Sequence, residues 1–110
     1  GADDAAQSLA AGELIPQTDP NTICDGLLTS LCDLTFNILN DHVEQIITVT
    51  DNEVLAAMKL IQQHLDLVVE PSSATVLAAI LKENFRALHG IRSIGLILAG
   101  GNIDTSTLPP

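Results

Sequence analysis

The sequence predicts an α/β fold, in the form of a partial three-layer domain with about four helices around two or more mostly parallel strands. Apolar residues recur at three- and four-residue steps in several stretches, and this is the period of an amphipathic helix. Two short aliphatic runs, 46–49 and 93–98, are typical of buried strands. At 110 residues, the chain is long enough for one domain at most.

The first part of the chain is expected to hold two helices and one strand. Residues Ala2–Ala11 are alanine-rich, begin with acidic side chains and precede Gly12, which suits a helix ending at Ala11. Residues 12–22 include two prolines, which indicate an irregular loop and a candidate wall of a site. Leucine and isoleucine spacing then predicts a helix over 27–41, and the strand at 46–49 follows.

Two further helices are expected in the second part. Thr50 and Glu53 form a capping-box pattern, which predicts that a helix begins there and continues to Leu65. The serine pair at 72–73 is suited to cap another helix that runs to about Leu88.

The second strand, at 93–98, leaves the predicted sheet incomplete. Strand, helix, helix and strand in this order indicate a parallel crossover. Parallel sheets are covered on both faces and need neighbouring strands to complete their hydrogen bonds. We therefore expect the missing strands to come from partner segments.

Charge and composition exclude several classes of function. Fourteen acidic and four basic residues give a net charge of −10, which repels nucleic acid and anionic membrane surfaces. No apolar run approaches the length of a transmembrane helix. Two cysteines, Cys24 and Cys32, make no disulfide framework and favour a reduced, cytoplasmic setting.

Common catalytic and metal motifs are missing. The three histidines lie 22 and 25 residues apart, and the cysteines lack the spacing of a zinc site. No Gly-x-Ser-x-Gly elbow is present to expose a serine nucleophile. Zinc binding and serine hydrolysis are therefore not expected.

Two features remain as candidates for a site. Gly100 and Gly101 follow an expected strand, where open α/β sheets bind ligands, although a tight turn that needs positive φ is the commoner reason for paired glycines. Glu70 precedes Pro71 at an expected helix start, where it is either a tuned acid or base or a cap that complements the helix dipole. Spacing alone does not separate these alternatives.

Six segments taken together resemble the C-terminal part of the serine racemase and threonine dehydratase family, whose members are fold-type II enzymes dependent on pyridoxal phosphate. The segments follow the family in order and spacing over nearly the whole chain and are Gly1–Ala5, Thr22–Leu27, Asp33–Thr35, Ile46–Val49, Val69–Ala74 and Gly100–Asp104. By this resemblance, residues 1–110 are the C-terminal portion of the large cofactor-binding domain.

The resemblance also implies roles for individual residues. Glu70 is expected near the active site, within a motif similar to Glu-Pro-Ser-Gly-Ala. The residues expected to contact pyridoxal phosphate are Gly26, Glu70, Ala99, Gly100, Gly101 and Asn102. Ala2 and Asp4 resemble contributors to a site for Mg²⁺ or Ca²⁺, whose further carboxylate ligand in the family precedes them in the chain.

Three residues depart from the family pattern. Ala99 stands where the family usually has a Ser or Cys that hydrogen-bonds the pyridine nitrogen, and an alanine side chain has no polar atom for that bond. Ser73 and Cys32 stand where Gly is common. The two lysines, Lys59 and Lys82, are expected on exposed helical faces, so neither is expected to carry the cofactor.

Two hypotheses for function follow from the resemblance. In the first, the chain is part of a serine racemase or threonine dehydratase and is inactive alone, because the cofactor-carrying lysine belongs to the family's N-terminal half. It then requires that half as its partner, or a second copy, and an amino acid as substrate. In the second hypothesis, the chain is a non-catalytic dimerisation or interaction module derived from the same family.

Overall fold

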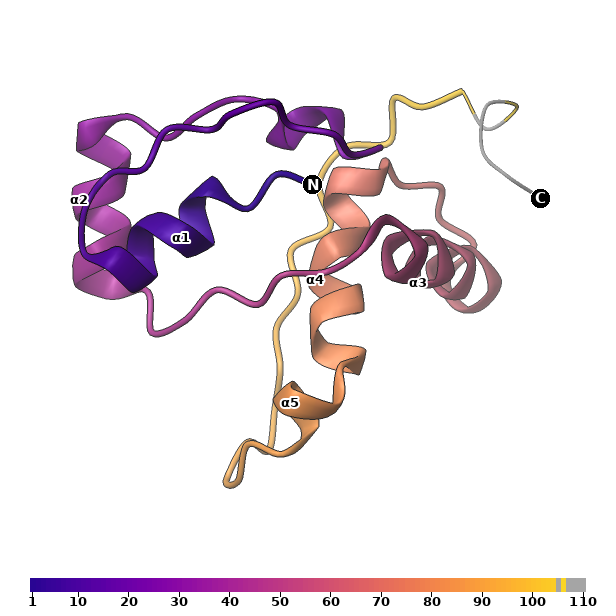
Figure 1. The fold of residues 1–110 in the computed structure, drawn as a ribbon. Helices are drawn as coiled ribbons and strands as arrows, with labels where there is room; N and C mark the ends of the chain where they lie inside the picture. Colours follow the sequence, from indigo (N-terminus) through magenta and orange to yellow (C-terminus); the bar gives the residue numbers. More distant parts are fainter. Residues whose placement is uncertain (105, 107–110) are drawn as a thin grey trace. The chain divides into compact units, whose positions relative to one another are not determined.

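The structure, a computed structural model, describes residues 1–104 and 106. The chain divides into two compact units, Gly1–Asp51 and the part from Asn52 onward. The described residues form six helical segments (Figure 1): α1 (Asp4–Ala11), η1 (Asp25–Leu27), α2 (Asp33–His42), α3 (Asp51–Leu65), α4 (Pro71–Leu81) and α5 (Glu83–Arg86). Within the part described, no helix combines the length and the apolar character needed to cross a membrane.

The first unit is built on α1, which packs against α2. The prediction that a helix ends at Ala11 is confirmed, because Gly12 adopts a left-handed conformation with φ 71° and donates its amide to Ser8 O at 2.9 Å. Ser8 is fully buried, and its Oγ donates to Asp4 O at 2.7 Å and accepts from Ile15 N at 2.9 Å. This hydroxyl thus joins α1 to the loop that follows it.

The second helix begins later than predicted. Residues Asp25–Leu27 form only the short η1, and α2 starts at Asp33. Two observations explain the delay. The Leu27 carbonyl, which a continuous helix would use internally, accepts a hydrogen bond from Gln17 Nε2 at 2.9 Å. Cys32 and Thr35 then form the cap of α2, with Cys32 N donating to Thr35 Oγ1 at 3.2 Å.

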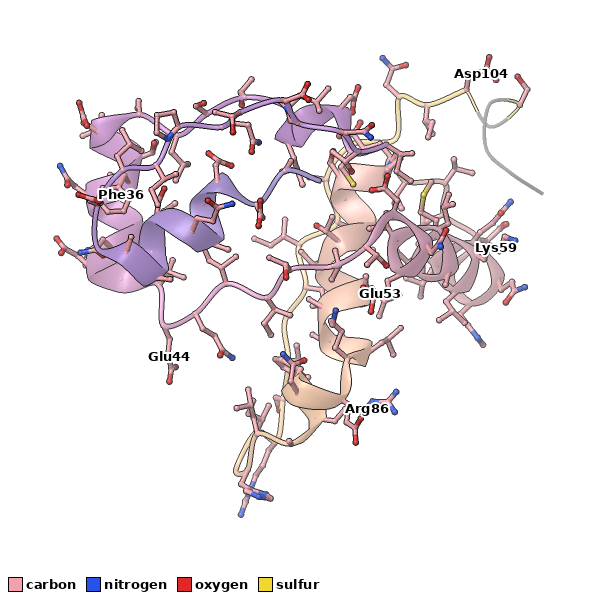
Figure 2. All side chains as sticks on the ribbon, viewed as in Figure 1. Phe36, Glu44, Glu53, Lys59, Arg86 and Asp104 are labelled. Carbon is pink, nitrogen blue, oxygen red and sulfur yellow. The ribbon has the colours of Figure 1, made fainter. Side chains whose placement is uncertain are left out.

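The second unit contains α3, α4 and α5. The predicted helix start after Thr50 is confirmed by α3, whose buried face consists of Val54, Ala57, Met58 and Ile61. The helix predicted to reach Leu88 is interrupted, because Lys82 adopts an extended conformation with φ −68° and ψ 146° between α4 and α5. Lys82 Nζ pairs with Glu53 Oε1 at 3.1 Å, and Glu53 is labelled in Figure 2.

The α/β prediction is wrong for the described residues, which contain helices but no strand. Residues 46–49 and 93–98 run as irregular segments between and after the helices (Figure 1). A strand exists only through backbone hydrogen bonds to a neighbour, and within the described part of the chain neither segment makes a backbone hydrogen bond of this kind. The aliphatic composition of 93–98 does not bury it, since Ile97 is 83% exposed.

Candidate functional site

Two segments of the second unit meet at the start of α4. Residues 99–101, called the glycine loop below, lie against the residues that lead into this helix. Glu70 N donates to Gly100 O at 3.2 Å, and Ala99 N donates to Ser73 Oγ at 2.9 Å. Two of the segments singled out from the sequence, 69–74 and 100–104, are therefore in direct contact.

The glycines of this loop are required by close packing. Gly100 has a φ of 84°, and an added Cβ would collide with the Glu70 carboxylate. A Cβ on Gly101 would lie 2.9 Å from Val68 O, closer than real Cβ contacts. Gly100 alone of the two has the positive φ that the turn interpretation required, and its missing side chain leaves space for the Glu70 carboxylate.

The Glu70 carboxylate is the unusual group of this cluster. Glu70 is the N-cap residue of α4, yet its side chain makes no hydrogen bond to the helix. Over residues 1–104 and 106, the carboxylate is assigned neither a hydrogen bond nor an ion pair, although it is half-buried. A carboxylate has acceptor sites for several hydrogen bonds. Glu70 therefore makes no capping hydrogen bond, and its place at the start of α4 still suits the helix dipole, so both interpretations stay open.

The other predicted cofactor contacts are placed separately. Asn102 follows the glycine loop and is exposed. Gly26 belongs to the first unit, where it lies within η1 and donates its amide to Asp25 Oδ1 at 2.9 Å. The structure therefore brings together Glu70, Ala99 and the two glycines, whereas the role of Gly26 toward a cofactor stays a prediction.

The predicted cation site at Ala2 and Asp4 also stays a prediction. Asp4 is 6% exposed, and its Oδ2 accepts the amide of Leu31 at 3.3 Å. In the described part of the chain, no group of three or more His, Cys, Asp or Glu residues could hold a metal ion. Hard cations such as Ca²⁺ take about six to eight oxygen ligands, so these two residues need further donors.

The two cysteines of the first unit differ in their environments. Burial raises the pKa of the Cys24 thiol, which is 2% exposed. A hydrogen bond with the Thr35 hydroxyl, at 3.3 Å from Sγ, lowers the pKa of the exposed Cys32 thiol. Both cysteines are free thiols.

Two polar contacts were not anticipated from the sequence. Ser73 stood out there as a possible helix cap and as a departure from the family pattern, and neither observation predicted its contact with Ala99. Asp51 carried no such signal, although its two oxygens accept hydrogen bonds from the Thr22 hydroxyl and from Ile23 N. The partners in that second contact are 28 and 29 residues apart, which no local pattern reveals.

Known proteins match this chain over nearly its whole length. The family model described as pyridoxal-phosphate dependent enzyme matches residues 1–100. The beta-hydroxyaspartate dehydratase of Paracoccus denitrificans is 50% identical over 108 residues, which cover 98% of this chain and 34% of that protein.

Two solved structures extend the comparison to the fold. Maize serine racemase matches with a TM-score of 0.93 and 44% identity, covering 97% of this chain and 33% of that chain. The T.th. threonine deaminase matches with a TM-score of 0.83 and 39% identity, covering 99% of this chain and 38% of that chain. The chain spans about a third of the length of the curated relatives it matches.

Proposed function

The chain belongs to the family of pyridoxal-phosphate dependent enzymes, and from this premise we propose that it is the C-terminal third of an enzyme that racemises or dehydrates hydroxy amino acids. The observation that carries the proposal is the half-buried Glu70 carboxylate, which lies against Gly100 and has no recorded partner among the described residues. A carboxylate in this situation is available to bind the substrate or to hold a proton.

The substrate class follows from what the relatives have in common. Serine, threonine and β-hydroxyaspartate, which appear in the names of the compared proteins, are all α-amino acids with a hydroxyl on the β-carbon. Racemisation and dehydration both begin with loss of the α-proton, and dehydration then also expels the β-hydroxyl. We therefore expect the enzyme to act on at least one of these three compounds.

The residues of the glycine loop fit one wall of a pyridoxal phosphate site. The loop has no side chain beyond a methyl group at Ala99, so a flat ring can approach its backbone closely, and the Glu70 carboxylate stands at its side. When bound, pyridoxal phosphate supplies an electron sink that stabilises the negative charge left at the α-carbon. In this proposal, the Glu70 carboxylate orients the bound amino acid, and it takes a proton from the amino acid or returns one to it.

The remaining parts of the site are assigned to the rest of the protein. Lys59 is exposed on α3 (Figure 2), and Lys82 is paired with Glu53. Neither lysine is therefore suited to carry the cofactor. The relatives are about three times as long as this chain. We therefore assign the lysine that carries the cofactor to a complementary N-terminal segment. The exposed aliphatic side chains at 91–97, among them Ile94 and Ile97, are the surface we assign to this segment.

The test compares the 110-residue chain with the full-length protein that carries it. Each is mixed with pyridoxal phosphate and then with serine, threonine or β-hydroxyaspartate. We expect the full-length protein to show the visible absorbance of bound cofactor and to convert at least one of the three compounds. The 110-residue chain alone should do neither. A full-length protein that binds no cofactor would refute the proposal.

A further inference from the structure

The start of α4 carries a buried hydroxyl beside the glycine loop. Ser73, in the first turn of α4, is 7% exposed, and its Oγ accepts the hydrogen bond from Ala99 N at 2.9 Å. This is the single hydrogen bond recorded for the Ser73 side chain in residues 1–104 and 106. The serine hydroxyl is thus used to hold a backbone group of the loop.

Two hydrogen bonds from α4 fix consecutive residues of the loop. Glu70 N binds the carbonyl of Gly100, and Ser73 Oγ binds the amide of Ala99. Removing the Ser73 hydroxyl leaves the loop with one of these two bonds. Gly100 has a left-handed conformation and no side chain of its own that could anchor the loop.

How much the hydrogen bond between Ser73 Oγ and Ala99 N stabilises the loop depends on whether water or a ligand covers the loop. Ala99 is exposed, so water can replace the hydroxyl as acceptor for its amide when nothing is bound. A cofactor that covers the loop excludes this water, and an amide without a partner then becomes costly. The bond should therefore matter more for cofactor binding than for folding.

We propose that Ser73 is a positioning residue, whose hydroxyl fixes the Ala99–Gly100 backbone against α4 and so sets the position of the glycine loop under the cofactor. This inference rests on the proposed function and adds to it a residue that touches neither cofactor nor substrate. Ala99 has no polar side chain to take this part itself. The polar group that shapes the loop therefore comes from the helix rather than from the loop.

The experiment uses the full-length protein with the variants Ser73→Ala, Ser73→Thr and Thr75→Val. Thr75→Val is the matched control, since the Thr75 hydroxyl donates to Ser72 O at 2.8 Å within α4. The dissociation constant of pyridoxal phosphate is measured by titration, and the unfolding midpoint is measured without cofactor. We expect Ser73→Ala to weaken cofactor binding about three- to tenfold. Its midpoint without cofactor should match that of Thr75→Val.

The remaining outcomes separate the positioning role from the proposed function. Ser73→Thr keeps the hydroxyl and should bind the cofactor as the wild type does, and so should Thr75→Val. Ser73→Gly is a second variant without the hydroxyl and should weaken binding as Ser73→Ala does. This pair keeps the test valid if the added methyl group of Ser73→Thr prevents folding. Normal cofactor binding by Ser73→Ala would overturn the positioning role alone. A wild-type protein without cofactor affinity would overturn the proposed function together with it.

Discussion

Three carboxylates, two in the first unit and one in the second, differ in their hydrogen-bond partners. In the first unit, Asp51 accepts hydrogen bonds from the Thr22 hydroxyl and from Ile23 N, and Asp4 accepts one from Leu31 N. In the second unit, the Glu70 carboxylate is packed on Gly100 without a recorded partner in the described part of the chain. The first two join parts of the first unit, whereas our proposal assigns the third to a ligand.

The difference in partners does not follow the difference in burial. Asp4 is nearly fully buried and Glu70 only half-buried, so burial alone would favour Asp4 as the functional group. Asp4 accepts a hydrogen bond from Leu31 N, whereas the Glu70 carboxylate has no donor among the described residues, so the hydrogen bonds favour Glu70 instead. A carboxylate with protein donors has its charge balanced by the fold, while one without them is hydrated by water and is open to a ligand.

The largest expected effect is on the contact that holds Glu70 in place. Gly100→Ala should destabilise the full-length protein by about 1–3 kcal/mol, since alanine strains a left-handed φ and its Cβ collides with Glu70. Cofactor binding should fall with it. Gly95→Ala is the control, because an added Cβ there meets nothing within 4 Å. Chemical unfolding measures both, and equal stability of the two variants would contradict the packing described.

The second prediction tests the structural use of Asp51. Asp51→Asn keeps the size of the side chain but removes the charge that strengthens both hydrogen bonds, and its NH2 end can reach Thr22 only if the direction of that hydrogen bond is reversed. We expect a loss of about 1–2 kcal/mol in the free energy of unfolding. Denaturant titration of the full-length protein measures this loss. If the variant is as stable as the wild type, the Asp51 carboxylate does not stabilise the fold, and the contrast drawn with Glu70 is wrong.

Much of the local structure was predictable from the sequence, and the long-range structure was not. Gly12 after a run of alanines and Thr50 before an amphipathic stretch predicted helix boundaries correctly, because capping depends on neighbours in the chain. The strands at 46–49 and 93–98 were wrong, because a strand depends on hydrogen-bond partners that the chain itself does not supply.

In the candidate site, too, local patterns were predictable and a long-range contact was not. Glu70 and the paired glycines were visible as local patterns, and the structure brings them together. The contact of Ser73 with Ala99 spans 26 residues and depends on how α4 meets the loop, so the sequence offered only the unusual serine.

A smaller effect is expected for the thiols of the first unit. The Thr35 hydroxyl lowers the pKa of the Cys32 thiol, so more of its reactive thiolate is present at neutral pH. Cys24 is buried with a raised pKa and should react far more slowly. Thr35→Val should raise the Cys32 pKa and shift its labelling curve to higher pH, with a rate about two- to fivefold lower at pH 7.

The measurement is the pH dependence of labelling by a thiol reagent, followed by mass spectrometry of the two cysteine peptides. Labelling of Cys24 before Cys32 would contradict the burial described for the first unit. An unchanged pH curve in Thr35→Val would show that the hydroxyl does not stabilise the thiolate.

The smallest effect concerns the ion pair of the second unit. Lys82 and Glu53 are partly exposed, at 28% and 38%, and their pairing should contribute at most about 1 kcal/mol. Lys82→Gln should therefore lower stability only slightly and leave the cofactor absorbance of the full-length protein intact. Loss of that absorbance in the variant would make Lys82 the residue that carries the cofactor and would contradict the assignment of that lysine to the N-terminal segment.

The comparison of the two units is tested most directly by Glu70→Gln in the full-length protein, with unfolding and turnover measured on the same sample. Because the described residues donate no hydrogen bond to the carboxylate, we predict a free energy of unfolding within about 0.5 kcal/mol of the wild type. Turnover of the best hydroxy amino acid should fall by about a hundredfold or more. A variant that is destabilised as much as Asp51→Asn, or one that keeps full turnover, would contradict the ligand-directed role of Glu70.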